Sequence, residues 1–118
     1  MICLTNDKWD RIKAQLEQDS LIDFLIIQKS WSLQTFGPGR RTVGLCNHIK
    51  SELTEILAEP DSLEEWIDVI VLALDATWRL GATPEEVVET LMNKQQQNLL
   101  RLWGPPPPED QPSFHIKE

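Results

Sequence analysis

The sequence predicts an all-α protein, built as a bundle of four core helices. Two observations predict this fold class. Apolar residues recur at helical spacing along nearly the whole chain, and the alternation of apolar and polar residues that is typical of strands is absent. The 118 residues are 41% hydrophobic and 25% charged, which are ordinary values for one globular domain. We therefore expect a single helical domain with a hydrophobic core of its own.

Capping residues, glycines and prolines delimit the expected helices. The first helix begins near Asn6, and a second begins at Asp19 or Ser20, both of which are favourable capping residues. The second helix ends at the glycine-proline-glycine turn at 37–39, because proline cannot continue a helix. Further helices are expected over residues 43–58, 62–80 and 84–103.

The last of these helices has the clearest start signal. Thr83 is a capping residue, Pro84 suits the first helical position, and Glu86 completes a capping box. After residue 103, four consecutive prolines predict an extended tail of polyproline II type. The expected organisation is an N-terminal helical extension at 1–18, the bundle at 19–103 and the proline-rich tail at 104–118.

The formal net charge of −8 is concentrated in the middle of the chain. Residues 45–89 hold eleven acidic residues against two basic ones, a net −9, whereas the segments on either side are close to neutral. This acidity argues against a nucleic acid polymer or an anionic membrane as partner. With no signal pattern and no apolar run of about 20 residues, we expect a cytoplasmic protein.

The key acids border the apolar faces of two helices. Glu52 and Glu55 lie on the expected 43–58 helix, at the edge of its apolar stripe. Glu65 and Asp68 lie on the 62–80 helix, which is apolar on most of its circumference and is therefore expected to be largely buried. Four converging carboxylates would suit Mg²⁺ or Mn²⁺, which prefer oxygen ligands. The alternative is a solvated acidic face on two adjacent helices.

The other candidate residues favour an anion. Lys94, Asn98 and Arg101 form one line on the last helix and suit phosphate oxygens, although they also suit solvated pairing with glutamates. Arg40 and Arg41 follow the 37–39 turn in a loop that suits closure over an anion, although it matches no known phosphate-binding motif.

The ordered set of motifs resembles a known family. Glu52-x-x-Glu55 followed by Glu65-x-x-Asp68 is similar to the E-x-x-E…E-x-x-D signature of MazG-like all-α NTP pyrophosphohydrolases. The segments that resemble its small phage branch of MazZ-type dATP/dGTP diphosphohydrolases run through Trp31-Ser-Leu-Gln-Thr-Phe-Gly-Pro-Gly-Arg-Arg-Thr, His48-Ile-Lys-Ser-Glu, Leu63-Glu-Glu-Trp-Ile-Asp and Lys94-x-x-x-Asn98-x-x-Arg101-x-Trp. The resemblance covers about residues 20–103.

The resemblance implies hydrolysis of a nucleoside triphosphate, dGTP or dATP in this branch, to the monophosphate and pyrophosphate. It implies Mg²⁺ or Mn²⁺ held by Glu52, Glu55, Glu65 and Asp68, and phosphates held by Lys94, Asn98 and Arg101. We expect Glu52 or Glu55 to orient or deprotonate the attacking water. Supporting residues are expected at the edges of this site: Trp31 and Gln28 at a base pocket, Arg40 and Arg41 at the phosphates, and His48 and Asp75 beside the metal ligands.

Two other functions are open at this point. One is a non-catalytic helical module whose acidic face binds a basic partner, and the other is a related pyrophosphohydrolase acting on dUTP or another nucleotide. The helix at 62–80 is too apolar for a short bundle to cover, so we also expect a homodimer or homotetramer. If a phage encodes the chain, the host cytoplasm is its expected location.

Overall fold

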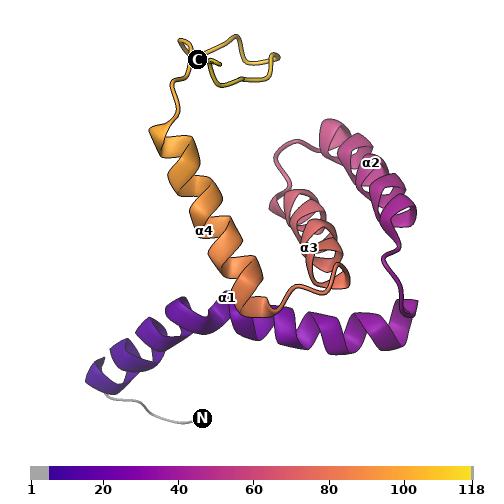
Figure 1. Ribbon diagram of the computed structural model, residues 1–118, viewed down its shortest axis with the longest axis vertical. Coiled ribbons are helices and arrows are strands. Elements are labelled where there is room, and N and C mark those ends of the chain that lie inside the picture. Colours follow the sequence, from indigo (N-terminus) through magenta and orange to yellow (C-terminus); the bar gives the residue numbers. More distant parts are fainter. Residues whose placement is uncertain (1–5, 118) are drawn as a thin grey trace. The chain divides into compact units, whose positions relative to one another are not determined.

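The computed structural model describes the backbone of residues 6–117 and the side chains of residues 20–117. Over these residues the chain forms four helices (Figure 1), namely α1 (Asn6–Phe36), α2 (Thr42–Ala58), α3 (Leu63–Arg79) and α4 (Pro84–Leu100). Within the described residues no strand forms, and only Trp103 and His115 make an isolated antiparallel bridge. The all-α prediction is therefore confirmed.

Helix α1 corrects the expected boundary near residue 19. The chain forms one continuous helix of 31 residues where the sequence predicted two helices. Asp19 and Ser20 favour a helix start but do not end a helix, and no glycine or proline interrupts the chain before Gly37. Gly37 ends the helix with φ 87°, a left-handed conformation that glycine adopts without strain.

Residues up to Val87 form one compact unit, and residues from Val88 onward form a second. In the first unit, α2 and α3 pack side by side as a hairpin, and α1 packs against α3 (Figure 1). Among the described side chains, the buried apolar ones are Leu25, Leu45, Ile56, Trp78 and Val87. This small core fixes the α2–α3 hairpin, which carries most of the predicted acidic residues.

The capping box at the start of α4 forms as predicted. The Glu86 amide donates to Thr83 Oγ1 at 3.1 Å, and the Thr83 amide donates to Glu86 Oε1 at 3.3 Å. The helix ends at Leu100, slightly earlier than residue 103.

The tail is not simply extended. Its end returns to the end of α4, where the Ile116 amide donates to the Leu102 carbonyl at 2.7 Å (Figure 1). A turn makes this return possible, because the Gln111 amide donates to the Pro108 carbonyl just after the prolines.

The predicted burial of the apolar helix is wrong for a single chain. On α3, Trp66, Ile67 and Ile70 expose 52%, 43% and 51% of their surface. Among the described residues of the first unit, α1 and α2 pack against α3 and leave part of its apolar circumference uncovered. Among the described helices, none has the length and apolar character needed to cross a membrane.

Candidate active site

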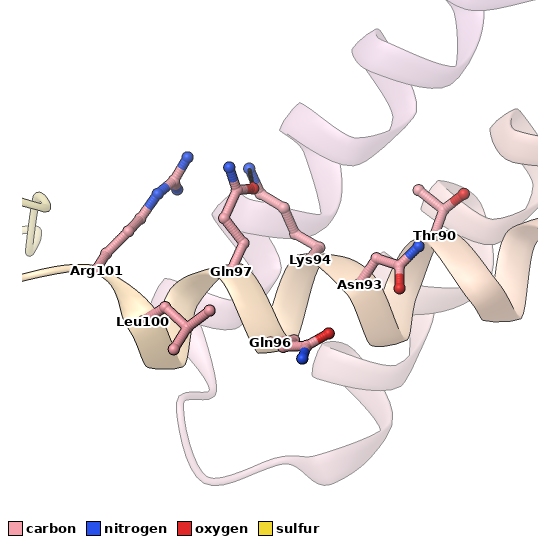
Figure 2. A pocket seen from close by; sticks show the side chains of 7 residues that line it. All are labelled: Thr90, Asn93, Lys94, Gln96, Gln97, Leu100 and Arg101. Carbon is pink, nitrogen blue, oxygen red and sulfur yellow. Dashed lines mark hydrogen bonds between the residues drawn. The ribbon is translucent and has the colours of Figure 1, made fainter.

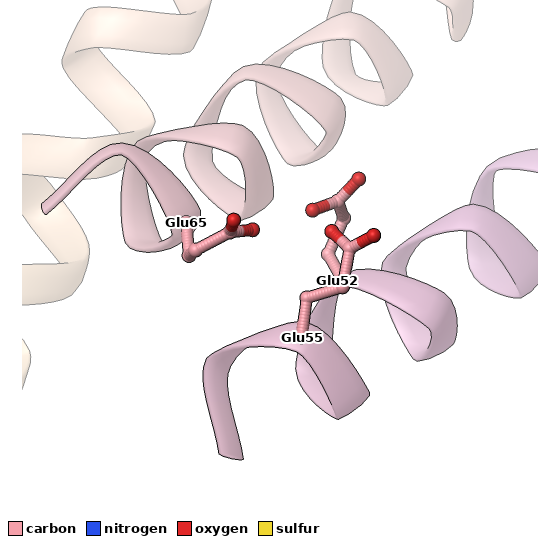
Figure 3. A group of neighbouring side chains, drawn as sticks. All are labelled: Glu52, Glu55 and Glu65. Atoms are coloured by element: carbon pink, nitrogen blue, oxygen red, sulfur yellow. The ribbon is translucent and has the colours of Figure 1, made fainter. Parts of the chain in front are cut away.

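The acidic site lies where α2 and α3 pack against each other. Glu52 and Glu55 are three residues apart on α2 and therefore share a face, and Glu65 lies in the first turn of α3. Carboxylate oxygens of these three glutamates all lie within 4.8 Å of one another, and Figure 3 shows the side chains pointing toward a common centre. The convergence expected from the sequence therefore forms for three of the four acids.

Asp68, the fourth expected ligand, is exposed and stands outside this close group. Its charge nevertheless acts on the group, because it contributes to raising the pKa of both Glu52 and Glu65. Asp68 is thus an acidic neighbour at the solvent side of the cluster.

Crowding and burial favour the protonated forms of two of the acids. Burial is the largest cause that raises the pKa of Glu65 to about 7, followed by a hydrogen bond with Glu55 and the nearby negative charges. The pKa of Glu52 is also raised, first by its hydrogen bond with Glu55, then by burial and like charge, while His48 opposes the shift. Without a cation, therefore, protonation of the cluster is favoured.

One carboxylate oxygen of Glu52 and one of Glu65 lack a hydrogen-bond partner among the described residues. These atoms, Glu52 Oε2 and Glu65 Oε2, are buried. The Glu52 side chain as a whole exposes only 12% of its surface. Since buried polar atoms in native proteins are nearly always satisfied, this pair of oxygens fits an oxygen-ligated divalent cation.

His48 lies next to this cluster. Its Nε2 lies 3.3 Å from Glu52 Oε1, one helical turn away on α2. The His48 side chain is 58% exposed, so it borders the acids from the solvent side. The structure therefore places His48 beside Glu52, and its role in supporting a metal site stays a prediction.

The two residues proposed for the base lie on α1 in different environments. Gln28 is buried, and both ends of its amide are bonded: it donates to the Val71 carbonyl at 2.8 Å and accepts from Trp78 Nε1 at 3.0 Å. Trp31 is 56% exposed. Both residues line a hollow of about 210 Å³ together with Phe24, Ile27 and Val71.

The arginines of the α1–α2 turn are exposed. Arg41 has φ 52°, and its guanidinium carbon lies 5.2 Å from the centroid of the Phe36 ring. The Phe36 ring in turn meets Trp31 edge to face, with 5.3 Å between centroids. Arg40 lies beside Arg41 and is likewise exposed.

The second unit holds the predicted phosphate residues along α4. Lys94 and Arg101 line a cavity of about 600 Å³, and Figure 2 shows their side chains on the same side of the helix as Gln97. Lys94 Nζ lies 3.5 Å from Gln97 Oε1, and an Arg101 guanidinium nitrogen lies 3.4 Å from Asn98 Oδ1. Lys94 and Arg101 therefore contact neutral amide oxygens in these bonds, which leaves their positive charge able to attract an anion.

Comparison with known proteins identifies the family. A family model described as dATP/dGTP pyrophosphohydrolase matches residues 26–118, which include the acidic cluster and α4. The chain belongs to this family. The resemblance to MazG-like pyrophosphohydrolases is thereby confirmed.

A dATP/dGTP pyrophosphohydrolase is a hydrolase that acts on nucleoside triphosphates. Over 61 residues the chain is also 36% identical to the Eaa protein of Salmonella phage P22, a stretch that covers 52% of this chain and 19% of that protein. The chain thus spans about a fifth of the length of this phage relative. No solved structure matches the chain significantly.

Sequence reasoning missed a buried polar network in this family member. Asp75, expected beside the metal ligands, instead accepts from Arg79 Nε at 2.6 Å and from Ser32 Oγ. Arg79 also donates to Ser32 Oγ at 2.9 Å. The available signal was Asp75 and Arg79 one turn apart on a helix that is otherwise apolar, because buried charges are almost always paired.

Proposed function

We propose that this chain is a metal-dependent diphosphohydrolase that converts dATP or dGTP to the monophosphate and pyrophosphate. Membership of the dATP/dGTP pyrophosphohydrolase family supports the substrate class. The observation that carries the proposal is the convergence of Glu52, Glu55 and Glu65, two of which, Glu52 and Glu65, each have a buried oxygen without a hydrogen-bond partner among the described residues. A solvated acidic face does not require such an arrangement.

The acidic cluster is the proposed metal and water site. Glu52, Glu55 and Glu65 would hold Mg²⁺ or Mn²⁺, with Asp68 contributing negative charge at the solvent side. Such an ion, when bound, polarises phosphoryl oxygens and neutralises charge that develops on them. The fit rests on the all-oxygen donor set, since hard cations prefer carboxylates.

The chain's own residues position and activate the water. A carboxylate of Glu52 or Glu55 accepts a proton from a water molecule, and the oxygen of that water attacks the α-phosphorus. The bond between the α-phosphorus and the bridging oxygen breaks, and pyrophosphate leaves with the bridging oxygen. His48, which borders Glu52, partly offsets the raised pKa of that carboxyl.

Cationic side chains are assigned to the phosphates. Lys94 and Arg101, with Asn98 between them, present donors along α4 and would offset the charge of the pyrophosphate group. Arg40 and Arg41 are exposed cations of the α1–α2 turn and are assigned to the same polyanionic substrate.

The base is assigned to the hollow beside Trp31. The indole of Trp31 is half exposed and free to stack on a purine. Because the amide of Gln28 is already bonded at both ends, Gln28 shapes the hollow and leaves base contacts to Trp31.

The exposed apolar surface of α3 favours a homodimer or homotetramer. Trp66, Ile67 and Ile70 lie on one helix and are each about half exposed, which is costly for a chain in water. Light scattering after size exclusion tests this proposal, and a monomer at micromolar concentration would contradict it. We place the enzyme in the host cytoplasm, where deoxynucleotides are available.

The activity is tested with a panel of substrates. The purified protein is incubated with each dNTP and NTP, and with dUTP, in Mg²⁺ or Mn²⁺, and the products are resolved by ion exchange. We expect monophosphate and pyrophosphate in equal amounts, fastest for dATP and dGTP, and none with chelator. Glu64→Gln, on an exposed neighbour of Glu65, is the matched control for Glu65→Gln. Absence of turnover with every triphosphate and both metals would overturn the proposal.

A further inference from the structure

Arg79 makes contacts that the proposed chemistry does not explain. It is a buried arginine at the end of α3, and it donates four hydrogen bonds. One stays within α3, at Asp75, and the other three reach α1 or the turn that follows it. One guanidinium nitrogen donates to the carbonyls of Gly37 and Gly39, at 2.9 and 3.0 Å. The same residue thus holds both sides of Pro38.

The Arg79 side chain is itself held in place by hydrogen bonds to Asp75 and Ser32. Asp75 accepts from both Arg79 and Ser32, and Ser32 Oγ accepts from Arg79, so α1 and α3 are joined by a ring of hydrogen bonds. The guanidinium also lies 4.6 Å from the centroid of the Trp78 ring. Arg79 is therefore fixed by its surroundings and serves as a rigid point of attachment for the turn.

The turn needs such an attachment. Gly37 and Gly39 have φ values of 87° and 97°, and Arg41 has φ 52°, so three of five successive residues are left-handed. Two exposed arginines, Arg40 and Arg41, follow directly. Three nitrogens of the planar Arg79 guanidinium share its four acceptors, whereas the ammonium group of lysine has three donors on a single nitrogen and cannot span the same positions.

We infer that Arg79 is a positioning residue that holds the turn at residues 37–41 and thereby places Arg40 and Arg41 for the phosphates of the substrate. Arg41 is the residue before α2, and Glu52 lies eleven residues further on, which is about 16 Å along the helix. An arginine side chain and a triphosphate chain together are long enough to bridge this distance. The inference rests on the proposed function for its substrate, but the attachment of the turn is a structural claim with a separate readout.

Limited trypsin digestion measures how easily the turn at residues 37–41 opens, and it does not depend on the enzymatic activity. In Arg79→Lys, cleavage after Arg40 and Arg41 should become about tenfold faster, because local opening is easier, while cleavage after Lys50 in α2 stays unchanged. Equal acceleration at both places would indicate global destabilisation and overturn the inference, as would unchanged cleavage in the turn.

Steady-state kinetics measure whether the turn contributes to substrate binding. We expect Arg79→Lys to raise KM for dATP and the inhibition constant of inorganic tripolyphosphate by about tenfold, with kcat little changed. Combining it with Arg40→Gln and Arg41→Gln should add nothing further, because both changes act through one element. Independent, multiplicative effects on KM would overturn the positioning role.

A second variant leaves the buried ring intact. Gly39→Ala strains the turn because of its positive φ, and it should raise KM as Arg79→Lys does. Gly44→Ala is the matched control, since a methyl group there meets no atom within 4 Å and φ is ordinary. If the wild type proves inactive but trypsin responds as expected, the proposed function fails while the attachment of the turn stands; equal KM values for Gly39→Ala and Gly44→Ala would overturn the inference.

Discussion

The two ends of α3 bury charge in opposite ways. Near the first end, Glu65 meets Glu52 and Glu55, and two buried oxygens lack partners within the described residues. Near the last, Asp75 is paired with Arg79 and Ser32. The chain supplies its own cation at one end and leaves the other end short of positive charge. Buried charged groups without a partner are typical of functional sites, so we infer that the first end of α3 is the reactive one.

The largest expected effect concerns activity at the unpaired end. Glu65→Gln should reduce kcat/KM for dATP by at least ~100-fold, because the amide removes a charge that a divalent cation requires. Steady-state kinetics in saturating Mn²⁺ measures this effect, with Glu64→Gln as control. Equal activity in the two variants would show that the cluster is not the reactive site.

Stability should respond in the opposite direction at the two ends. Asp75→Asn leaves the buried Arg79 without its counter-charge and should lower the free energy of unfolding by about 3 kcal/mol. Glu65→Gln relieves repulsion and should leave the metal-free protein as stable as the wild type, or more stable. Urea denaturation measures both variants, and a loss of stability in both would remove the contrast.

Metal binding should stabilise the protein through one end alone. Mn²⁺ at about 100 times its Kd should add roughly 2.7 kcal/mol to the wild type, because the ion binds only the folded cluster. The gain should disappear in Glu65→Gln and persist in Glu64→Gln. Thermal unfolding in Mn²⁺ and in chelator gives the measurement, and an equal gain in all three proteins would place the ion elsewhere.

The smallest effect is a dependence of stability on pH. The pKa of Glu65 is raised from 4.5 to about 7, mainly by burial, so between these values the folded state holds a proton that the unfolded state releases. The metal-free protein should therefore lose stability as pH rises from 4.5 through 7, and the Glu65 contribution should level off above. Melting temperatures across this range should fall less steeply in Glu65→Gln; identical slopes would contradict the assignment.

Much of the site followed from helical periodicity. The spacing of Glu52 and Glu55 put both on the border of an apolar stripe, and their position beside Glu65 followed once α2 and α3 formed a hairpin. Helix starts were equally predictable where a capping box marks them, as at Thr83. The continuity of α1 was not, because Asp19 and Ser20 favour a start without forbidding continuation.

Short-range sequence patterns predict α2, α3 and the start of α4, the excess of acid in the middle of the chain and the faces on which the acids lie, because these depend on residues within a few positions of one another. The tertiary packing established that Asp75 pairs with Arg79 and Ser32, and that Arg79 holds the carbonyls of a turn 40 residues earlier. It also decided how much of α3 stays exposed. Such contacts join segments distant in sequence, and local periodicity carries no information about which of them will meet.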